Sequence, residues 1–192
     1  MSDLLYLGSQ SEPRKKLLTD AGIRNKVLSH KSDEGFEYDG VNFQDHVIEI
    51  AKHKMELLVM PDFKDIEDAE RGIFVLTADT LVRTSKSNIV LGKPVDRKDG
   101  ERMLKLECEE PVEVATGCCL ELKKFKDGSW TTDVQKAWAT SSEVEFCIPP
   151  EFYDYFYNIK PIALHCAGSA VIEDVGSLFL KSIKGNYSAI LG

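Results

Sequence analysis

Apolar positions in the first part of the chain follow the spacing of a strand and then of a helix. Residues 4–7 form an apolar run of the size of a buried strand. Residues 12–20 are predicted to be helical, with Ser11 as the N-cap, Pro13 in the first turn and Gly22 just beyond the end. A strand, a polar turn and a helix start in this order direct free backbone N–H groups towards a ligand above the sheet.

The middle of the chain continues this mixture of strands and helices. Residues 44–58 carry apolar side chains at helical spacing, and residues 73–76 form the clearest buried strand, directly before Asp79. Further elements are predicted at residues 27–29 (strand), 81–91 (hairpin), 96–106 (helix capped by Asp96), 112–125 and 130–148 (two long strands), 150–157 (short aromatic helix) and 162–192 (short strands interrupted by glycines).

This order of elements predicts the α/β class with a mixed, strongly curved sheet. Helices are concentrated early and a long hairpin lies in the middle, which excludes a pure sandwich or a helical bundle. A chain of 192 residues is the length of one domain, or of one elongated unit with two lobes. No internal repeat or linker divides it, so we expect a single domain over residues 1–192.

Composition narrows the classes of function. With 24 basic and 32 acidic residues the formal net charge is −8, which excludes a generally basic surface for a nucleic-acid polymer. The chain has no signal-peptide pattern, and its apolar runs fall short of the ~18 residues that span a membrane, so we expect a soluble, cytoplasmic protein. The five cysteines have no CxxC spacing and fit reduced thiols better than a disulfide framework.

The first turn region is a candidate anion site. Ser9, Ser11, Arg14 and Lys15 surround the predicted helix start, where backbone donors and the helix dipole favour negative charge. Basic residues are also common on solvated helix flanks, and this plainer interpretation stays open.

Other charged residues occur where they could carry chemistry. Asp79 could hold a divalent metal ion or take a proton from water, or it could be a turn aspartate that bonds nearby N–H groups. Lys93 lies in a tight Gly-Lys-Pro turn, and Lys54 interrupts the apolar stripe of its helix, where it either snorkels or points into a cleft. Glu34 belongs to an acidic pair in a loop. Together these cations and carboxylates suit a magnesium-bound phosphate substrate.

In combination, these pieces resemble the Maf family of nucleoside triphosphate pyrophosphatases over essentially the whole chain. The resemblance rests on the order and spacing of several short segments. They are residues 5–11 with Arg14 to Leu18, residues 29–34, Ala51-Lys52-His53-Lys54, Ala78-Asp79-Thr80, Leu91-Gly92-Lys93-Pro94, Thr116-Gly117, and Ala167-Gly168-Ser169 with Glu173, Gly176, Phe179 and Ile183-Lys184-Gly185.

This resemblance implies a two-lobed α/β fold, related to the inosine triphosphate pyrophosphatases, with a nucleotide-binding cleft. It implies hydrolysis of a nucleoside triphosphate to the monophosphate and pyrophosphate with Mg²⁺ or Mn²⁺, in a protein that is commonly a homodimer. By position, Asp79 would activate water or bind the metal, Glu34 would be a metal-binding carboxylate, and Ser9, Arg14, Lys54 and Lys93 would hold the triphosphate, with Ser11, Lys15 and Glu173 as further substrate-binding residues.

The resemblance also indicates a base preference. Arg14-Lys15, residues 166–169 (Cys-Ala-Gly-Ser) and Glu173 look like the branch that acts on 7-methyl-GTP, and a carboxylate is a sensible partner for a guanine N1/N2 edge. Ala78-Asp79-Thr80, by contrast, is the form common in the branch that acts on dTTP and UTP. Glu12 adds a negative charge near the phosphates, so a catalytically weak nucleotide-binding regulator is a further alternative.

Overall fold

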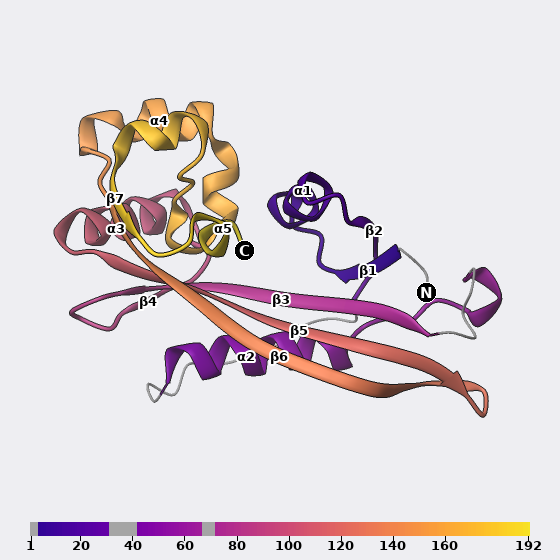
Figure 1. Ribbon diagram of the computed structural model, residues 1–192. Helices are drawn as coiled ribbons and strands as arrows, with labels where there is room; N and C mark the ends of the chain where they lie inside the picture. Colours follow the sequence, from indigo (N-terminus) through magenta and orange to yellow (C-terminus); the bar gives the residue numbers. More distant parts are fainter. Residues whose placement is uncertain (1–3, 31–41, 67–71) are drawn as a thin grey trace. The chain divides into compact units, whose positions relative to one another are not determined.

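The computed structural model describes residues 4–30, 42–66 and 72–192. Over these ranges the chain has the predicted α/β class, with one mixed sheet of seven strands and helices packed on it (Figure 1). The strand order is β2-β1-β3-β5-β6-β7, and the short strand β4 pairs with β3. No helix in these three ranges is long and apolar enough to cross a membrane.

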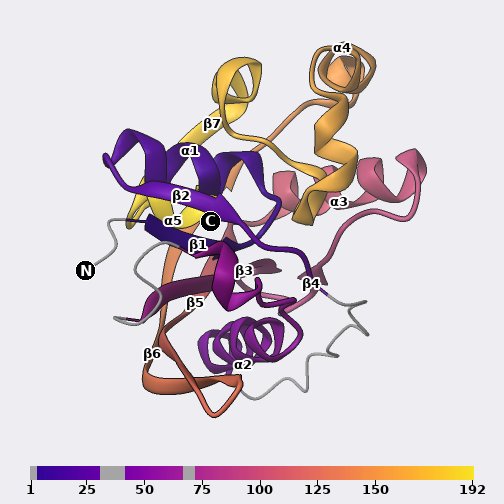
Figure 2. The ribbon, with the colours of Figure 1, turned by 90° about the vertical axis from the view of Figure 1, so that its right-hand side faces the viewer.

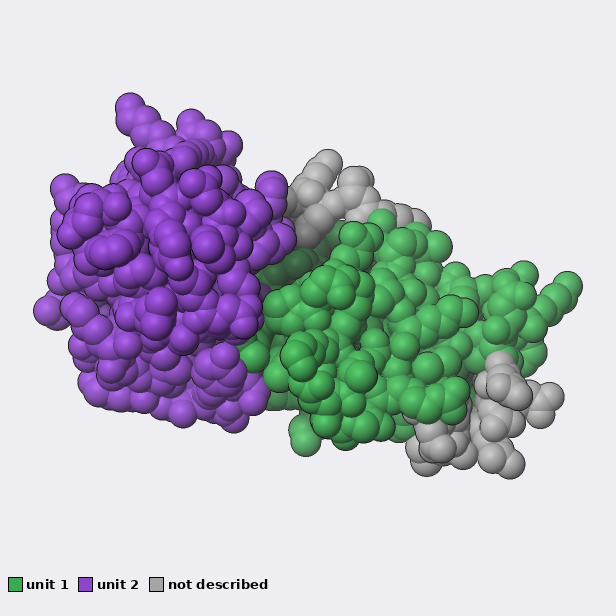
Figure 3. Space-filling model, turned by 90° about the horizontal axis from the view of Figure 1, so that it is seen from above, with its two compact units in different colours: residues 1–79, 116–139, 191–192 green, residues 80–115, 140–190 purple. Residues whose placement is uncertain are grey.

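The chain divides into two compact units, coloured separately in Figure 3. Unit 1 comprises Met1–Asp79, Thr116–Ala139 and Leu191–Gly192, and unit 2 comprises Thr80–Ala115 and Thr140–Ile190. Strands β3 (Ile73–Thr84), β5 (Val112–Lys126) and β6 (Ser129–Phe146) each contribute residues to both units. This division agrees with the expected two-lobed fold.

The N-terminal part of unit 1 forms the predicted strand and helix, followed by a second strand that covers residues 24–27 and not the predicted 27–29. Strand β1 (Leu4–Gly8) runs parallel to β2 (Arg24–Val27) on one side and to β3 on the other. Helix α1 (Glu12–Asp20) makes the crossover that parallel neighbours require, and the left-handed φ of +74° at Gly22 ends it as expected. Figures 1 and 2 show α1 and α2 on opposite faces of these strands.

Helix α2 (Phe43–Glu56) starts one residue earlier than predicted. The side chain of Asn42 accepts hydrogen bonds from the backbone N–H groups of Gln44 and Asp45, so Asn42 is the N-cap. Phe43 is buried and anchors the first turn. The inner face of α2 packs into the core of unit 1, whose buried members are Tyr6, Leu28, Ala51, Met55, Leu58, Ile66, Ile73, Val75 and Cys119.

Strand β3 is longer than predicted, and the prediction that a strand ends before Asp79 was wrong. β3 runs without interruption from Ile73 to Thr84, so Asp79 lies inside it and is not a turn residue. The polar sequence around Asp79 hid this continuity. Thr77 is fully buried, and its hydroxyl donates to the carbonyl oxygen of Ala51 at 2.6 Å, which lets a polar residue continue the inward-facing side of the strand.

Both predicted hairpins are present. Strand β4 (Val90–Leu91) returns antiparallel on β3 after a turn that contains Asn88, and β5 and β6 are joined at Asp127 and Gly128, all with positive φ. Helix α3 (Arg97–Glu109) begins at the predicted cap, where the Asp96 side chain accepts from the N–H of Asp99, and it extends past the predicted end at residue 106.

The tail differs from its prediction as a set of short strands. After helix α4 (Tyr153–Ile159) the chain forms 3₁₀ turns. All residues from 160 to 192 are described, and this stretch contains one strand, β7 (Leu180–Lys184). Helix α5 (Tyr187–Leu191) follows β7. Gly168, Ser169 and Asp174 adopt φ values of 73°, 58° and 52°, and left-handed residues of this kind interrupt a strand ladder.

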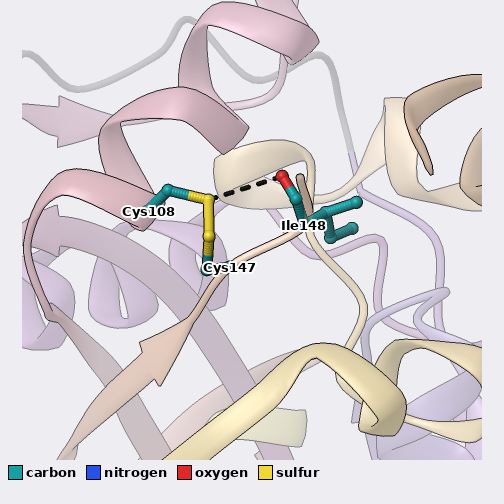
Figure 4. Close-up of a disulfide and its surroundings, with 3 residues drawn as sticks. All are labelled: Cys108, Cys147 and Ile148. Carbon is teal, nitrogen blue, oxygen red and sulfur yellow. Dashed lines mark hydrogen bonds between the residues drawn. A yellow bond between two sulfur atoms is a disulfide. The ribbon is translucent and has the colours of Figure 1, made fainter. Parts of the chain in front are cut away.

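The prediction of reduced thiols was wrong for one pair of cysteines. Cys108, near the end of α3, forms a disulfide with Cys147, directly after β6 (Figure 4). Both belong to unit 2 and are separated by 39 residues in sequence. Cys118, Cys119 and Cys166 are free, as expected. The odd number of cysteines and the absence of CxxC spacing argued against a disulfide. The pairing could not be predicted, because sequence alone does not reveal that the end of α3 meets the end of β6.

Reducing the Cys108–Cys147 disulfide is expected to destabilise the protein. By the loop-entropy relation, releasing a loop of this length costs about 4 kcal/mol of unfolding free energy. Urea unfolding with and without dithiothreitol would measure the loss. The double variant Cys108→Ser/Cys147→Ser should match the reduced protein, whereas Cys166→Ser, which removes a free thiol, should still respond to the reductant. Equal midpoints with and without reductant would contradict the expectation.

A methyl group at Gly117 is expected to push α2 away from the sheet. A Cβ on this residue of β5 would lie 2.2 Å from the carbonyl oxygen of Val47, which is backbone and cannot give way. We expect Gly117→Ala to lower the unfolding free energy by about 3 kcal/mol, at the upper end for overpacking. Gly92→Ala is the matched control, because its Cβ would meet nothing within 4 Å. The unfolding free energies of both variants can be measured by chemical denaturation. A Gly117→Ala protein as stable as Gly92→Ala would refute the packing argument.

Candidate active site

Ser9 and Arg14 meet at the end of the first strand. Ser9 directly follows β1 and is almost fully buried. Its hydroxyl oxygen accepts hydrogen bonds from the Arg14 guanidinium at 3.0 Å and from the backbone N–H of Ser11 at 3.3 Å. The same Nη1 of Arg14 donates to the carbonyl oxygen of Ala78 at 2.8 Å. These contacts bring two of the predicted phosphate-binding residues together beside β3.

Lys54 and Asp79 form an ion pair in the same unit. The Nζ of Lys54 lies 2.7 Å from Oδ1 of Asp79, and their side chains are 22% and 15% exposed. Lys54 therefore points towards the catalytic candidate, and the snorkelling alternative does not describe it. The hydrogen bond between Thr77 and Ala51, one turn earlier on α2, fixes the helix against the strand at this point.

Arg14 lies in the electrostatic field of this pair. Burial lowers the pKa of Arg14, while the nearby Asp79 carboxylate and the Cys118 thiol oppose that shift. Ser9, Arg14, Lys54 and Asp79 thus form one cluster in unit 1, which we call the Asp79 cluster. It places two cations, a hydroxyl and a carboxylate within reach of a small anion.

Cys118 belongs beside this cluster and was missed by the sequence analysis. It lies on β5, and burial raises the pKa of its thiol, whereas the neighbouring Arg14 lowers it. The thiol is therefore protonated at neutral pH. In the sequence, Cys118 directly follows Thr116-Gly117, one of the segments on which the family resemblance rests. That position is the one feature that could have drawn attention to the cysteine, and the resemblance gave it no role.

Ser11 and Lys15 have different surroundings from those expected. Ser11 occupies the N-cap of α1, but its side chain makes no capping hydrogen bond. Lys15 pairs with Glu12 at 2.5 Å, and the Glu12 side chain is 82% exposed. The extra negative charge of Glu12 is thus compensated by a neighbouring lysine. Exposed pairs of this kind contribute at most about 1 kcal/mol, so Lys15 can exchange its partner for a phosphate.

In unit 2 the predicted residues Lys93 and Glu173 both act on Cys166. Burial is the main reason why the pKa of the Cys166 thiol is raised; Glu173 raises it further and Lys93 lowers it. The backbone joins the same two segments, since the N–H of Gly168 donates to the carbonyl oxygen of Gly92 at 3.0 Å. Glu173 also affects Tyr187. Burial is the main reason why the pKa of the Tyr187 phenol is raised, and the Glu173 carboxylate raises it further.

Among the described residues, Asp79 is the predicted metal ligand whose surroundings can be compared with what a divalent ion needs. Glu34, the predicted second carboxylate, lies outside the described residues. Elsewhere in the described chain no group of three or more His, Cys, Asp and Glu residues could hold a metal ion. The Asp79 carboxylate supplies hard oxygen atoms, one of which already binds Lys54. A single carboxylate fits Mg²⁺ or Mn²⁺, because Mg²⁺ usually binds through one or two carboxylates, substrate phosphates and water.

Three named relatives are similar to this chain over almost its whole length. A chain named dTTP/UTP pyrophosphatase from Geotalea uraniireducens is 31% identical over 98% of this chain and 88% of its own length. Another of that name from Anaeromyxobacter sp. is 30% identical, covering 100% of this chain and 84% of its own. A protein named nucleoside triphosphate pyrophosphatase from Prochlorococcus marinus is 27% identical over 98% of this chain and 91% of its own.

The family comparison covers almost the whole chain. The sequence profile of Maf-like proteins matches residues 4–192, which include the Asp79 cluster in unit 1 and both Lys93 and Glu173 in unit 2. With its mixed α/β sheet, its two compact units and this match, the protein belongs to the Maf family.

Proposed function

We propose that the protein is a nucleoside triphosphate pyrophosphatase, which hydrolyses its substrate to the nucleoside monophosphate and pyrophosphate. The observation that carries the proposal is the Lys54–Asp79 pair at 2.7 Å beside the Ser9–Arg14 contact. Membership of the Maf family and the names of the relatives support it. We further propose that residues 1–192 act as one catalytic domain.

The Asp79 cluster has the groups that a triphosphate needs. Arg14 presents a planar guanidinium that can form two parallel hydrogen bonds to phosphate oxygens, and Lys54 adds a compact positive charge. The start of α1 contributes backbone N–H groups that the Ser11 side chain does not cap. These donors would hold the negative charge of the triphosphate, with Ser11 and Lys15 at its margin.

Asp79 is the residue proposed to act on water. An ionised carboxylate held by Lys54 can accept a proton from a water molecule as that water attacks the α-phosphorus. The α–β phosphoanhydride bond then breaks, and pyrophosphate leaves with the bonding electron pair. Asp79 and Glu34 would hold a Mg²⁺ or Mn²⁺ ion, which when bound neutralises phosphate charge. Lys93 is proposed to stabilise the departing pyrophosphate.

The preferred base has two candidates. Residues 166–169 and Glu173 favour 7-methyl-GTP, because the carboxylate can accept from the N1 and N2 donors of a guanine. The relatives named dTTP/UTP pyrophosphatase and the segment Ala78-Asp79-Thr80 favour a pyrimidine at least as well. Both candidates share the same hydrolysis of the phosphoanhydride.

A nucleotide-binding regulator with weak catalysis is the alternative from another class of function. It was suggested by the added charge of Glu12. The ion pair between Glu12 and Lys15 compensates that charge and therefore favours the catalytic interpretation. A homodimer is also part of the proposal, and exposed apolar side chains in α4 and on either side of it would suit such an interface: Phe152, Tyr155, Ile159 and Ile162.

Replacing the proposed water-activating carboxylate is expected to abolish turnover. Asp79→Asn keeps the shape of the side chain but cannot take a proton, so we expect kcat to fall by about a hundredfold or more. Lys93→Ala should reduce kcat strongly as well. Pyrophosphate release with Mg²⁺ or Mn²⁺ is the measurement. Glu113→Gln is the matched control, since Glu113 is a similarly exposed carboxylate paired with Arg83. Full activity of Asp79→Asn would disprove the assignment, and binding without turnover in the wild type would favour the regulator.

A substrate panel separates the two base preferences. We expect pyrophosphate release from 7-methyl-GTP, GTP, dTTP, UTP, CTP and ITP to be unequal. If Glu173 accepts from a guanine edge, Glu173→Gln should lower kcat/KM for 7-methyl-GTP by about tenfold and leave UTP within about twofold. A wild-type preference for dTTP or UTP would keep the mechanism and overturn the guanine assignment.

A further inference from the structure

Glu107, on α3 in unit 2, is a buried acid that the proposed reaction does not use. It is 4% exposed, and its carboxyl group lies close enough to Tyr153 to add to the effect of burial in raising the pKa of that phenol. Burial raises the pKa of Glu107 well above the ordinary value, because the charged form is disfavoured away from water. Burying an ionisable group costs free energy, which calls for a reason.

The carboxyl of Glu107 lies directly against the backbone of Gly168. A Cβ on Gly168 would come within 2.4 Å of Oε1 of Glu107, so the acid occupies the space that any side chain there would need. Gly168 also has a φ of 73°, a conformation that side chains disfavour. The left-handed φ favours glycine at this position, and a side chain here would in addition force the Glu107 carboxyl to shift.

Two further contacts hold the same segment, residues 166–169. The N–H of Gly168 donates to the carbonyl of Gly92, which precedes Lys93 in the chain. The hydroxyl of Ser169 shares a buried hydrogen bond of 2.8 Å with the phenol of Tyr157. Ser169 has a φ of 58°, and a non-glycine residue in this region persists only when its surroundings hold it there.

We infer that Glu107 is a positioning residue for base selection, because it packs against Gly168 and thereby holds the segment that leads to Glu173. The inference rests on the proposed function, in which Glu173 contacts the base and Lys93 the phosphates. Glu107 itself touches neither, since its contact is with the Gly168 backbone. Because this role depends on the shape of the side chain, an uncharged group of the same shape should serve as well.

Kinetics on three variants test this role. Glu107→Gln should keep kcat/KM within about threefold of wild type for every nucleotide, because it preserves the shape of the side chain. Glu107→Ala should raise KM for the preferred nucleotide by about tenfold, change kcat by less than about threefold, and reduce the discrimination between 7-methyl-GTP and UTP. Met103→Ala, a buried truncation one turn earlier on α3, is the control for lost stability and should leave discrimination unchanged.

A double-variant cycle tests the contact itself without relying on activity. Gly168→Ala should lower the Tm by roughly 6 °C or more, through the clash with Glu107 and the strained φ. In the Glu107→Ala background the clash is gone, so the loss should be less than half as large. Equal losses in both backgrounds would show that Glu107 does not press on Gly168 and would overturn the inference.

The outcomes separate this inference from the proposed function. A wild type that releases no pyrophosphate contradicts the proposed function, and affinities for 7-methyl-GTP and UTP, measured by calorimetry, then replace the kinetic comparison. If Glu107→Ala alters the ratio of these affinities and Glu107→Gln does not, the inference stands. It falls if Glu107→Ala discriminates as wild type does, if Met103→Ala changes the ratio equally, or if wild type binds neither nucleotide.

Discussion

Helix α2 approaches β3 and β5 so closely that only particular residues fit between them. The Thr77 hydroxyl bonds the carbonyl oxygen of Ala51, and at Gly117 the backbone of β5 comes against that of Val47. Both contacts join α2 to the strands, and both fix the axial and rotational position of the helix. The position of Lys54 follows from them, since it lies one turn beyond Ala51 and meets Asp79. The charge geometry of the Asp79 cluster is therefore a product of tight packing.

The parts of this arrangement that could be predicted are those governed by local physics. Helix caps, turn residues and the apolar spacing of α1, α2 and the β5–β6 hairpin agree with the structure to within a few residues. Ser9 and Arg14 are five residues apart, in a turn and the helix start that follows it. Two residues so near in sequence were therefore expected to lie close together. The proximity of Lys54 to Asp79 depends in addition on the parallel crossover between strands. The roles of these two residues were assigned through the family resemblance and not through their spacing.

What could not be predicted depends on contacts between distant segments. Cys118 approaches Arg14 only because β5 lies beside β3, and Glu107 meets Gly168 only because α3 packs on the segment after α4. The disulfide needs the same kind of information. The predicted strand ended too early because the polar residues at 77–80 resemble a turn. In the structure the strand continues, since the hydroxyl of the buried Thr77 donates a hydrogen bond to a backbone carbonyl. The tail was misjudged because positive φ at Ser169 and Asp174 is not visible in residue types.

The chain passes between its two units at four points: three lie inside the strands β3, β5 and β6, and the fourth lies inside helix α5. This has a consequence for synthesis on the ribosome. The first stretch of unit 1 ends at Asp79, but its remaining strand segments are complete only at Ala139, 60 residues later. At roughly 5–20 residues per second this delay is several seconds. During it the growing chain carries β1, β2 and the start of β3 without their neighbour β5, so an unpaired strand edge is open to chaperones or to another nascent chain.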